Sequence, residues 1–232
     1  MENLKRLVHD LESERNIEKQ VAKLQEIGKV LLTEYVIAFG NVLIEPLRVE
    51  AYYYPYNDTA KFNDLCAHPS STKVNNFGRL YFIEGRYGYP GIDLCLSLGE
   101  YYLSFLIKDS RVDGKLFKQI DLYEKFQNDW KEIQKINVLH RIENNGKTVF
   151  YTSRVGLKES QTEFFHKRLA AVTEIDNQYT WEKGFAKLNT IANYLVENGI
   201  EETDENIRRI LHSRSNEVKK YCEEIRESKQ EI

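Results

Sequence analysis

The chain has 232 residues, of which 41% are hydrophobic and 30% charged, which is enough for one large domain or a domain with an appendage. Its formal net charge of -3 argues against a strongly basic nucleic-acid-binding protein, although a local basic face could still exist. The cysteines Cys66, Cys95 and Cys222 have neither metal-site nor disulfide spacing, which predicts a reduced, cytoplasmic setting. No apolar run approaches the length of a membrane span, and no membrane partner is expected.

Apolar residues follow a helical spacing at the start of the chain, and strand-like apolar runs come after them. Apolar residues recur at helical spacing over residues 2–28, which predicts one or two amphipathic helices ending at Gly28. Residues 29–39 are rich in Val, Leu, Ile and Tyr and predict a strand. The turn signal Gly40-Asn41 and the apolar run at residues 42–54 predict the returning strand.

The middle of the chain alternates predicted strands with turn signals. Residues 55–77 are expected to form a long loop, of the kind that often carries function. An amphipathic helix is expected over residues 117–136. Residues 138–142 and 148–152 flank Asn144-Asn145-Gly146, a strong turn signal, and predict a β-hairpin. Further strands are expected at residues 78–89, 92–98, 101–107 and 169–175.

The composition changes after Trp181, where apolar spacing predicts two amphipathic helices. The chain is therefore expected to have a main domain at residues 1–180, beginning with a helix at 1–20, and a helical extension at 181–232. Two interpretations of the extension stay open. It is either a helical pair packed on the domain, or a contact for a protein partner or for self-association.

Glu50 ends an apolar run and is followed directly by tyrosines, including Tyr52. A carboxylate beside aromatic rings could position or deprotonate a water in a base-binding pocket. His68, in the following loop, could donate a hydrogen bond to a phosphate or a base. Each feature also has a structural interpretation: a solvated carboxylate, tyrosines packed in a sheet, and a surface histidine. On its residues alone, the chain is a soluble domain of helices and strands with a tyrosine-lined cleft.

Several segments, in order, resemble motifs of the alkyladenine (3-methyladenine) DNA glycosylases. The stretch Arg48-Val49-Glu50-Ala51-Tyr52 resembles the family's active-site strand, and Ala67-His68 resembles the motif that follows it. The resemblance runs from residue 21 to residue 177. The other pieces are Leu24–Leu31, Gly78–Phe82, Tyr87-Gly88-Tyr89, Leu94–Ser97, Phe105–Lys108, Arg154–Leu157 and Lys167–Leu169.

This resemblance implies an α+β fold, a single mixed domain with a curved, mostly antiparallel sheet flanked by helices, followed by the helical C-terminal extension. It also implies a monofunctional DNA glycosylase of base-excision repair. Such an enzyme acts on double-stranded DNA and hydrolyses the N-glycosidic bond of a flipped alkylated or deaminated purine with a Glu-activated water. The resemblance implies neither a metal nor an organic cofactor.

The resemblance also assigns roles to residues. Glu50 is expected to be the general base and Tyr87 to intercalate in the duplex. Base contacts are expected from Tyr52, His68, Tyr81, Ser97 and Lys108. DNA backbone contacts are expected from Arg79, Arg86, Arg154, Lys167 and Arg168.

The chain departs from the family at positions that bear on selectivity. Ser97 replaces an asparagine that helps to select among purines, and Lys108 replaces an arginine whose planar fork it cannot reproduce. Ile83 stands where a second stacking tyrosine is expected. Two alternatives therefore stay open. One is a catalytically inactive relative that binds nucleic acid, a nucleoside or a protein partner, and the other is an enzyme or binder for a free nucleobase or nucleoside.

Overall fold

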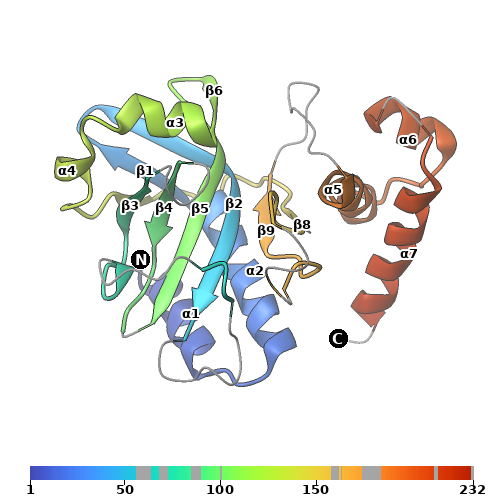
Figure 1. Cartoon of the computed structure of the whole chain (residues 1–232), viewed down its shortest axis with the longest axis horizontal. Helices are drawn as coiled ribbons and strands as arrows, with labels where there is room; N and C mark the ends of the chain where they lie inside the picture. The colour runs from blue at the N-terminus through green and yellow to red at the C-terminus, as the bar shows by residue number, and fades with distance from the viewer. Residues whose placement is uncertain are drawn as a thin grey trace.

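Nine strands in the described part of the chain form one curled sheet in which all neighbours run antiparallel (Figure 1). The computed structural model describes residues 1–55, 64–67, 73–84, 90–99, 101–157, 162, 164–173, 184–211 and 214–230. The strands are β1 (Tyr35–Phe39), β2 (Val42–Tyr54), β3 (Arg79–Ile83), β4 (Gly91–Cys95), β5 (Tyr102–Val112), β6 (Lys115–Lys118), β7 (Leu139–Arg141), β8 (Phe150–Thr152) and β9 (Ala170–Val172). Their order is β3-β4-β5-β2-β1-β7, with β6 beside β5 and the β8–β9 pair beside β2.

Helices pack on this sheet and extend beyond it (Figure 1). They are α1 (Glu2–Ser13), α2 (Ile17–Glu34), α3 (Gln119–Phe126), α4 (Trp130–Ile133), α5 (Gly184–Glu197), α6 (Asp204–Leu211) and α7 (Asn216–Gln230). No helix in the described ranges is long and apolar enough to cross a membrane. The expected α+β class, the antiparallel sheet with its helices and the C-terminal helices are confirmed.

The alternation of side chains along β2 separates two faces of the sheet. Val49, Ala51 and Tyr53 belong to the main hydrophobic core, together with the buried residues of α1 and α2. Because successive side chains of a strand point to opposite faces, Glu50 and Tyr52 lie on the other face. We call this second face the site face, and it carries the polar groups described below.

The prediction of a strand at residues 29–39 is wrong for the first half of that range. Helix α2 continues to Glu34, and the strand begins at Tyr35. Gly28 therefore does not end the helix but lies inside it, where a Cβ atom would come within 3.0 Å of the Ala171 Cβ atom on β9. The close approach of helix and sheet explains the glycine, and burial of the helix face outweighs the strand propensity of the Val and Leu residues.

The hairpin expected around Asn144-Asn145-Gly146 is also wrong, although the turn residues do form local hydrogen bonds. The strand before it, β7, pairs with β1, and the strand after it, β8, pairs with β9. The turn instead closes the end of α2, because Asn145 donates from its backbone to Thr33 O (2.9 Å) and from its side chain to Leu32 O (3.0 Å). These two bonds satisfy carbonyls that the end of a helix leaves open.

The single helix expected over residues 117–136 is divided. Its first residues, Phe117 and Lys118, complete strand β6, and two shorter helices, α3 and α4, follow. Pairing of β6 with β5 therefore decides the conformation of residues whose spacing alone indicated a helix.

The C-terminal helices have a hydrophobic core of their own. It contains Ile191, Ala192, Leu195, Ile207, Val218, Cys222 and Ile225. Helix α5 lies beside β8 and β9 at the edge of the sheet (Figure 1), where Tyr194 makes an edge contact with Phe150 of β8, with ring centroids 5.7 Å apart. Helix α5 thus packs on the main domain, and α6 and α7 pack on α5.

The close packing of α2 on β9 gives a direct test. Gly28→Val is expected to lower the free energy of unfolding by about 1–3 kcal/mol, because the added atoms overpack the contact with Ala171. Ala22→Val, at an exposed position of the same helix, is the control and should lose at most about 0.7 kcal/mol. Urea denaturation measures both, and equal losses in the two variants would contradict the close packing.

Candidate functional site

The carboxylate of Glu50 is fully buried at the centre of the site face, with 0% exposure. Cross-strand pairing places Leu106 of β5 opposite Glu50, Asp93 of β4 opposite Leu106, and Tyr81 of β3 opposite Asp93. On the other side, Ala170 of β9 is paired with Glu50. Because directly paired residues share a face, Glu50 and Asp93 lie on the site face with one apolar side chain between them, roughly 10 Å apart along the sheet.

Three groups hold the Glu50 carboxylate in place. The Tyr52 hydroxyl donates to Oε2 at 3.0 Å, and the backbone N–H of Val155 donates to Oε1 at 2.8 Å. The guanidinium of Arg48 lies 3.6 Å from Oε1. A carboxylate has about two acceptor positions on each oxygen, so both oxygens retain capacity for one more donor, such as a water. The arrangement fixes the orientation of the Glu50 carboxylate.

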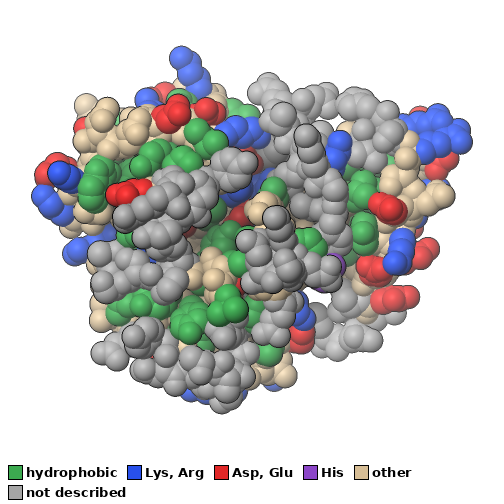
Figure 2. Space-filling view, viewed as in Figure 1, with side chains coloured by type: hydrophobic (Ala, Val, Ile, Leu, Met, Phe, Trp, Pro, Cys, Tyr) green, Lys and Arg blue, Asp and Glu red, His purple; other side chains and the backbone are tan. Residues whose placement is uncertain are grey.

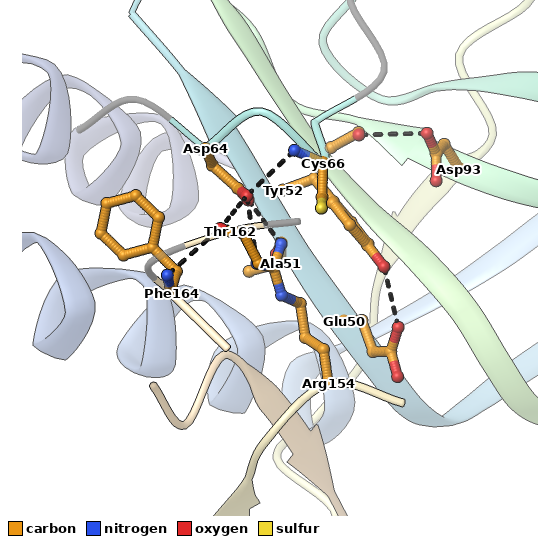
Figure 3. Close-up of polar contacts among 10 residues, drawn as sticks. Glu50, Ala51, Tyr52, Asp64, Cys66, Asp93, Arg154, Thr162 and Phe164 are labelled. Carbon is orange, nitrogen blue, oxygen red and sulfur yellow. Dashed lines mark hydrogen bonds and ion pairs between the residues drawn. The ribbon is translucent and has the colours of Figure 1, made fainter. Parts of the chain in front are cut away.

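Tyr52 is a hydrogen-bond donor whose ring is covered on one side. Burial raises the pKa of the Tyr52 phenol well above its usual value, and the neighbouring Glu50 carboxylate raises it further. The phenol therefore stays protonated and keeps donating to Glu50. The Arg154 guanidinium lies 4.6 Å from the ring centroid (Figure 3). One face of the ring is thus occupied, and stacking on a base would have to use the opposite face.

Arg154 belongs to a buried ion pair with Asp64 (Figure 3). Its Nη1 and Nη2 atoms donate to the two carboxylate oxygens at 2.5 and 3.1 Å, and Nη1 also donates to Ala51 O at 3.2 Å. Burial is the largest single effect and disfavours the charged guanidinium, but Asp64, Tyr52 and Glu50 together outweigh it, and the pKa of Arg154 is raised. Arg154 is only 2% exposed and its charge is paired inside the protein, so the DNA backbone contact expected of it stays a prediction that this arrangement does not favour.

A second buried ion pair lies on the same face at β4. Lys73 Nζ is 2.5 Å from Asp93 Oδ2, and the Ser104 hydroxyl donates to the same oxygen at 3.1 Å. The ammonium also lies 4.9 Å from the centroid of the Tyr81 ring. Within the described residues, Asp93 Oδ1 is buried without a hydrogen-bond partner. This oxygen is an acceptor whose capacity the surrounding described side chains do not use.

Two of the expected base contacts have other roles here. The Ser97 hydroxyl is fully buried and accepts a hydrogen bond from the Leu103 backbone N–H at 2.9 Å, so it stabilises the connection between β4 and β5. Lys108 lies at an irregularity of the β2–β5 pairing, where Val49 pairs with Ile107 but Arg48 with Asp109. The guanidinium beside Glu50 therefore comes from Arg48 of the same strand and not from position 108.

The basic residues expected on DNA are dispersed. Lys167 forms an ion pair with Glu18 of α2, and Arg168 donates to Asn193 Oδ1 of α5 at 3.4 Å. Arg79 is exposed on β3. On the face shown in Figure 2, the described basic side chains lie mostly near the rim, with acidic side chains among them. His68, Arg86 and Tyr87 lie outside the described residues.

The sequence interpretation missed most of the buried charged groups around Glu50. Asp64, Lys73 and Asp93 were not singled out, and the hydrogen bond from the Val155 backbone leaves no mark in the sequence. Asp93 did carry a signal, because an aspartate inside the apolar run Gly91–Leu96 is a charge in a strand that is expected to be buried. Among the residues that the structure describes, no group of three or more His, Cys, Asp or Glu side chains could hold a metal ion.

Neither a comparison with protein-family models nor one with curated proteins finds a match to this chain.

The buried pair beside Tyr52 makes a stability prediction. Arg154→Met should lower the free energy of unfolding by about 3–5 kcal/mol, because it leaves the Asp64 carboxylate buried without its cation. Lys167→Met breaks a partly exposed ion pair with Glu18 and should lose less than about 1 kcal/mol. Denaturant unfolding of both variants measures the difference, and an Arg154 variant as stable as the Lys167 variant would show that the buried pair does not stabilise the fold.

Proposed function

We propose that this protein hydrolyses the N-glycosidic bond of damaged purine nucleotides in DNA, with Glu50 as the general base. The observation that carries the proposal is the Glu50 carboxylate, which is held by the Tyr52 hydroxyl and the Val155 N–H on the site face. It occupies the strand position that the resemblance to the alkyladenine DNA glycosylases assigns to the catalytic base. The α+β fold with its curled antiparallel sheet agrees with that resemblance.

The chemistry requires one proton acceptor and one water. The water oxygen attacks C1′ of the flipped nucleotide and gives a proton to Glu50, while the electrons of the C1′–N9 bond leave with the purine. The products are the free base and an abasic site. Glu50 then returns the proton to the departing base or to solvent. The fixed orientation of the carboxylate lowers the cost of bringing water, base and sugar into line.

The groups around Glu50 support this chemistry without taking part in proton transfer. The protonated Tyr52 phenol keeps donating to Oε2, and stacking of a base would use the face of its ring that lies away from Arg154. The Arg154–Asp64 pair backs the other face of that ring. Stacking of a base on an aromatic ring is worth about 1–3 kcal/mol, which helps to offset extrusion of the nucleotide.

A free nucleoside or nucleobase is the second candidate substrate, and the charge distribution favours it. The formal net charge is -3, and the cations nearest Glu50 are paired with acids inside the protein. A protein that binds duplex DNA normally presents unpaired Lys and Arg to the phosphates. The same pocket chemistry would act on a nucleoside without that basic surface.

Replacement of the proposed base tests the proposal. Glu50→Gln should lower the rate of excision by about 10²- to 10⁴-fold, because the amide fills the same space but cannot take up the proton. The assay is release of hypoxanthine, ethenoadenine or a methylated purine from a labelled duplex. Tyr52→Phe keeps the ring and removes one hydrogen bond to Glu50, so it should have a smaller effect. Excision by the glutamine variant at the wild-type rate would refute the assignment, and no excision by folded wild type would refute the DNA reaction.

Salt dependence separates the two substrate classes. Binding that uses 6–10 phosphate contacts should weaken by about 10³- to 10⁵-fold between 50 and 200 mM salt, whereas nucleoside binding should hardly change. Arg79→Ala should reduce the salt slope for duplex DNA by about one, because Arg79 is an exposed cation on the strand that carries Tyr81. Lys19→Ala, on helix α2 of the opposite face, is the control with the same change in charge. Fluorescence anisotropy measures all three proteins, and equal slopes would exclude Arg79 from the DNA surface.

A further inference from the structure

The backbone that holds Glu50 lies beyond the last pairing of the sheet. Strand β8 ends at Thr152, which is paired with Ala170 of β9. Residues 153–155 follow in irregular conformation, and the Val155 N–H that reaches Glu50 belongs to this short segment. No strand ladder in the described structure fixes it, so its position depends on side-chain contacts.

One of those contacts comes from the C-terminal extension. The side-chain oxygen of Asn189, in helix α5, accepts a hydrogen bond from the Ser153 backbone N–H at 3.2 Å and from the Thr152 hydroxyl at 3.3 Å. Asn193, one turn later, donates to the same oxygen at 3.1 Å and to the Asn189 carbonyl at 2.9 Å, which orients the amide. These residues are all buried, so the hydrogen bonds are protected from competition by water.

Helix α5 is itself supported by the other two C-terminal helices. Its apolar residues Ile191 and Leu195 pack in the second hydrophobic core with residues of α6 and α7. Arg226 of α7 donates two hydrogen bonds to the Glu202 carboxylate, both at 2.5 Å, just before α6 begins. The extension therefore gives Asn189 a fixed position relative to the sheet.

We propose that Asn189 is a positioning residue for the reaction at Glu50, and that the C-terminal helices are a structural part of the active site. Asn189 holds Ser153, the segment 153–155 carries the Val155 N–H, and that N–H fixes the Glu50 carboxylate. The catalytic consequence rests on the function proposed above, while the positional claim concerns the geometry alone.

The test compares two neighbouring buried residues in the full-length chain. Asn189→Ala removes the acceptor for Ser153. Thr190→Val removes a hydroxyl that contacts Thr152 at 2.8 Å in the same interface, but it leaves the Ser153 bond in place. Two readouts are used: hydrogen exchange of the Val155 amide by NMR, and kcat and KM for excision from the damaged duplex.

Asn189→Ala is expected to speed exchange at Val155 by at least about tenfold. It should also lower kcat by about 10- to 100-fold, with KM changed by less than about twofold, because misplacement of a catalytic group affects the reaction more than binding. Thr190→Val should leave both readouts near wild type. Asn193→Ala, which removes the group that orients Asn189, is the milder variant and should change both readouts in the same direction by less.

Wild-type exchange at Val155 in the Asn189 and Asn193 variants would overturn the proposal, as would an equal effect of Thr190→Val. If folded wild-type protein excises no base, the proposed function fails and the exchange at Val155 still decides the positional claim. If wild type is active and the Asn189 variant keeps its kcat despite faster exchange, the positioning role is refuted while the function stands.

Discussion

A fully buried carboxylate at the centre of a sheet is the constraint on which this site depends. A charge that is removed from water is stable only when donors and counter-charges replace the solvent. For Glu50 they come from Tyr52 two residues ahead, from Arg48 two residues behind, and from the Val155 backbone, which is distant in sequence. Arg48 also lies between Glu50 and Asp109, whose other oxygen is 3.0 Å from Lys118. The polar chain thus extends from the site to the edge strand β6.

The molecule joins two hydrophobic cores through a largely polar contact. The larger core lies between the sheet and helices α1 and α2, and the smaller one is enclosed by α5, α6 and α7. Between them, Thr152, Ser153, Asn189 and Asn193 form buried hydrogen bonds that meet at the side-chain oxygen of Asn189. Directional bonds fix relative orientation more narrowly than apolar contact does, because a buried donor or acceptor that loses its partner is costly. In the proposed reaction, this polar contact would set the position of the backbone segment that holds Glu50.

Local patterns predicted the elements that depend on local forces and failed where distant contacts decide. The strand at Val42–Tyr54 and the helices α1 and α2 were predicted from their apolar residues, although α2 continues past its predicted end to Glu34. The hairpin around Asn145 was not, since the turn caps α2 and its flanking strands pair elsewhere. The same division holds in the site. Resemblance singled out Glu50 and Tyr52, but Arg154 and Asp64 are 90 residues apart, and composition cannot show that they pair. Arg154 was therefore taken for a surface cation.

The pairing of charges in the site affects how fast a substrate would associate and how the site would discriminate between substrates. Glu50 is matched by Arg48, Asp64 by Arg154 and Asp93 by Lys73, so these described pairs add little net charge to attract phosphates from a distance. Association without electrostatic steering is slower, and discrimination must then come from contacts made after the base has entered. The candidates for such contacts on the site face are Tyr52, Leu106 and Asp93, whose Oδ1 atom has no hydrogen-bond partner among the described residues. These side chains would distinguish bases by their shape and their hydrogen-bonding groups. This would hold equally for a base in a DNA duplex and for a free nucleoside. For the proposed function, the phosphate contacts, rather than the contacts to the base, would therefore distinguish the two substrate classes.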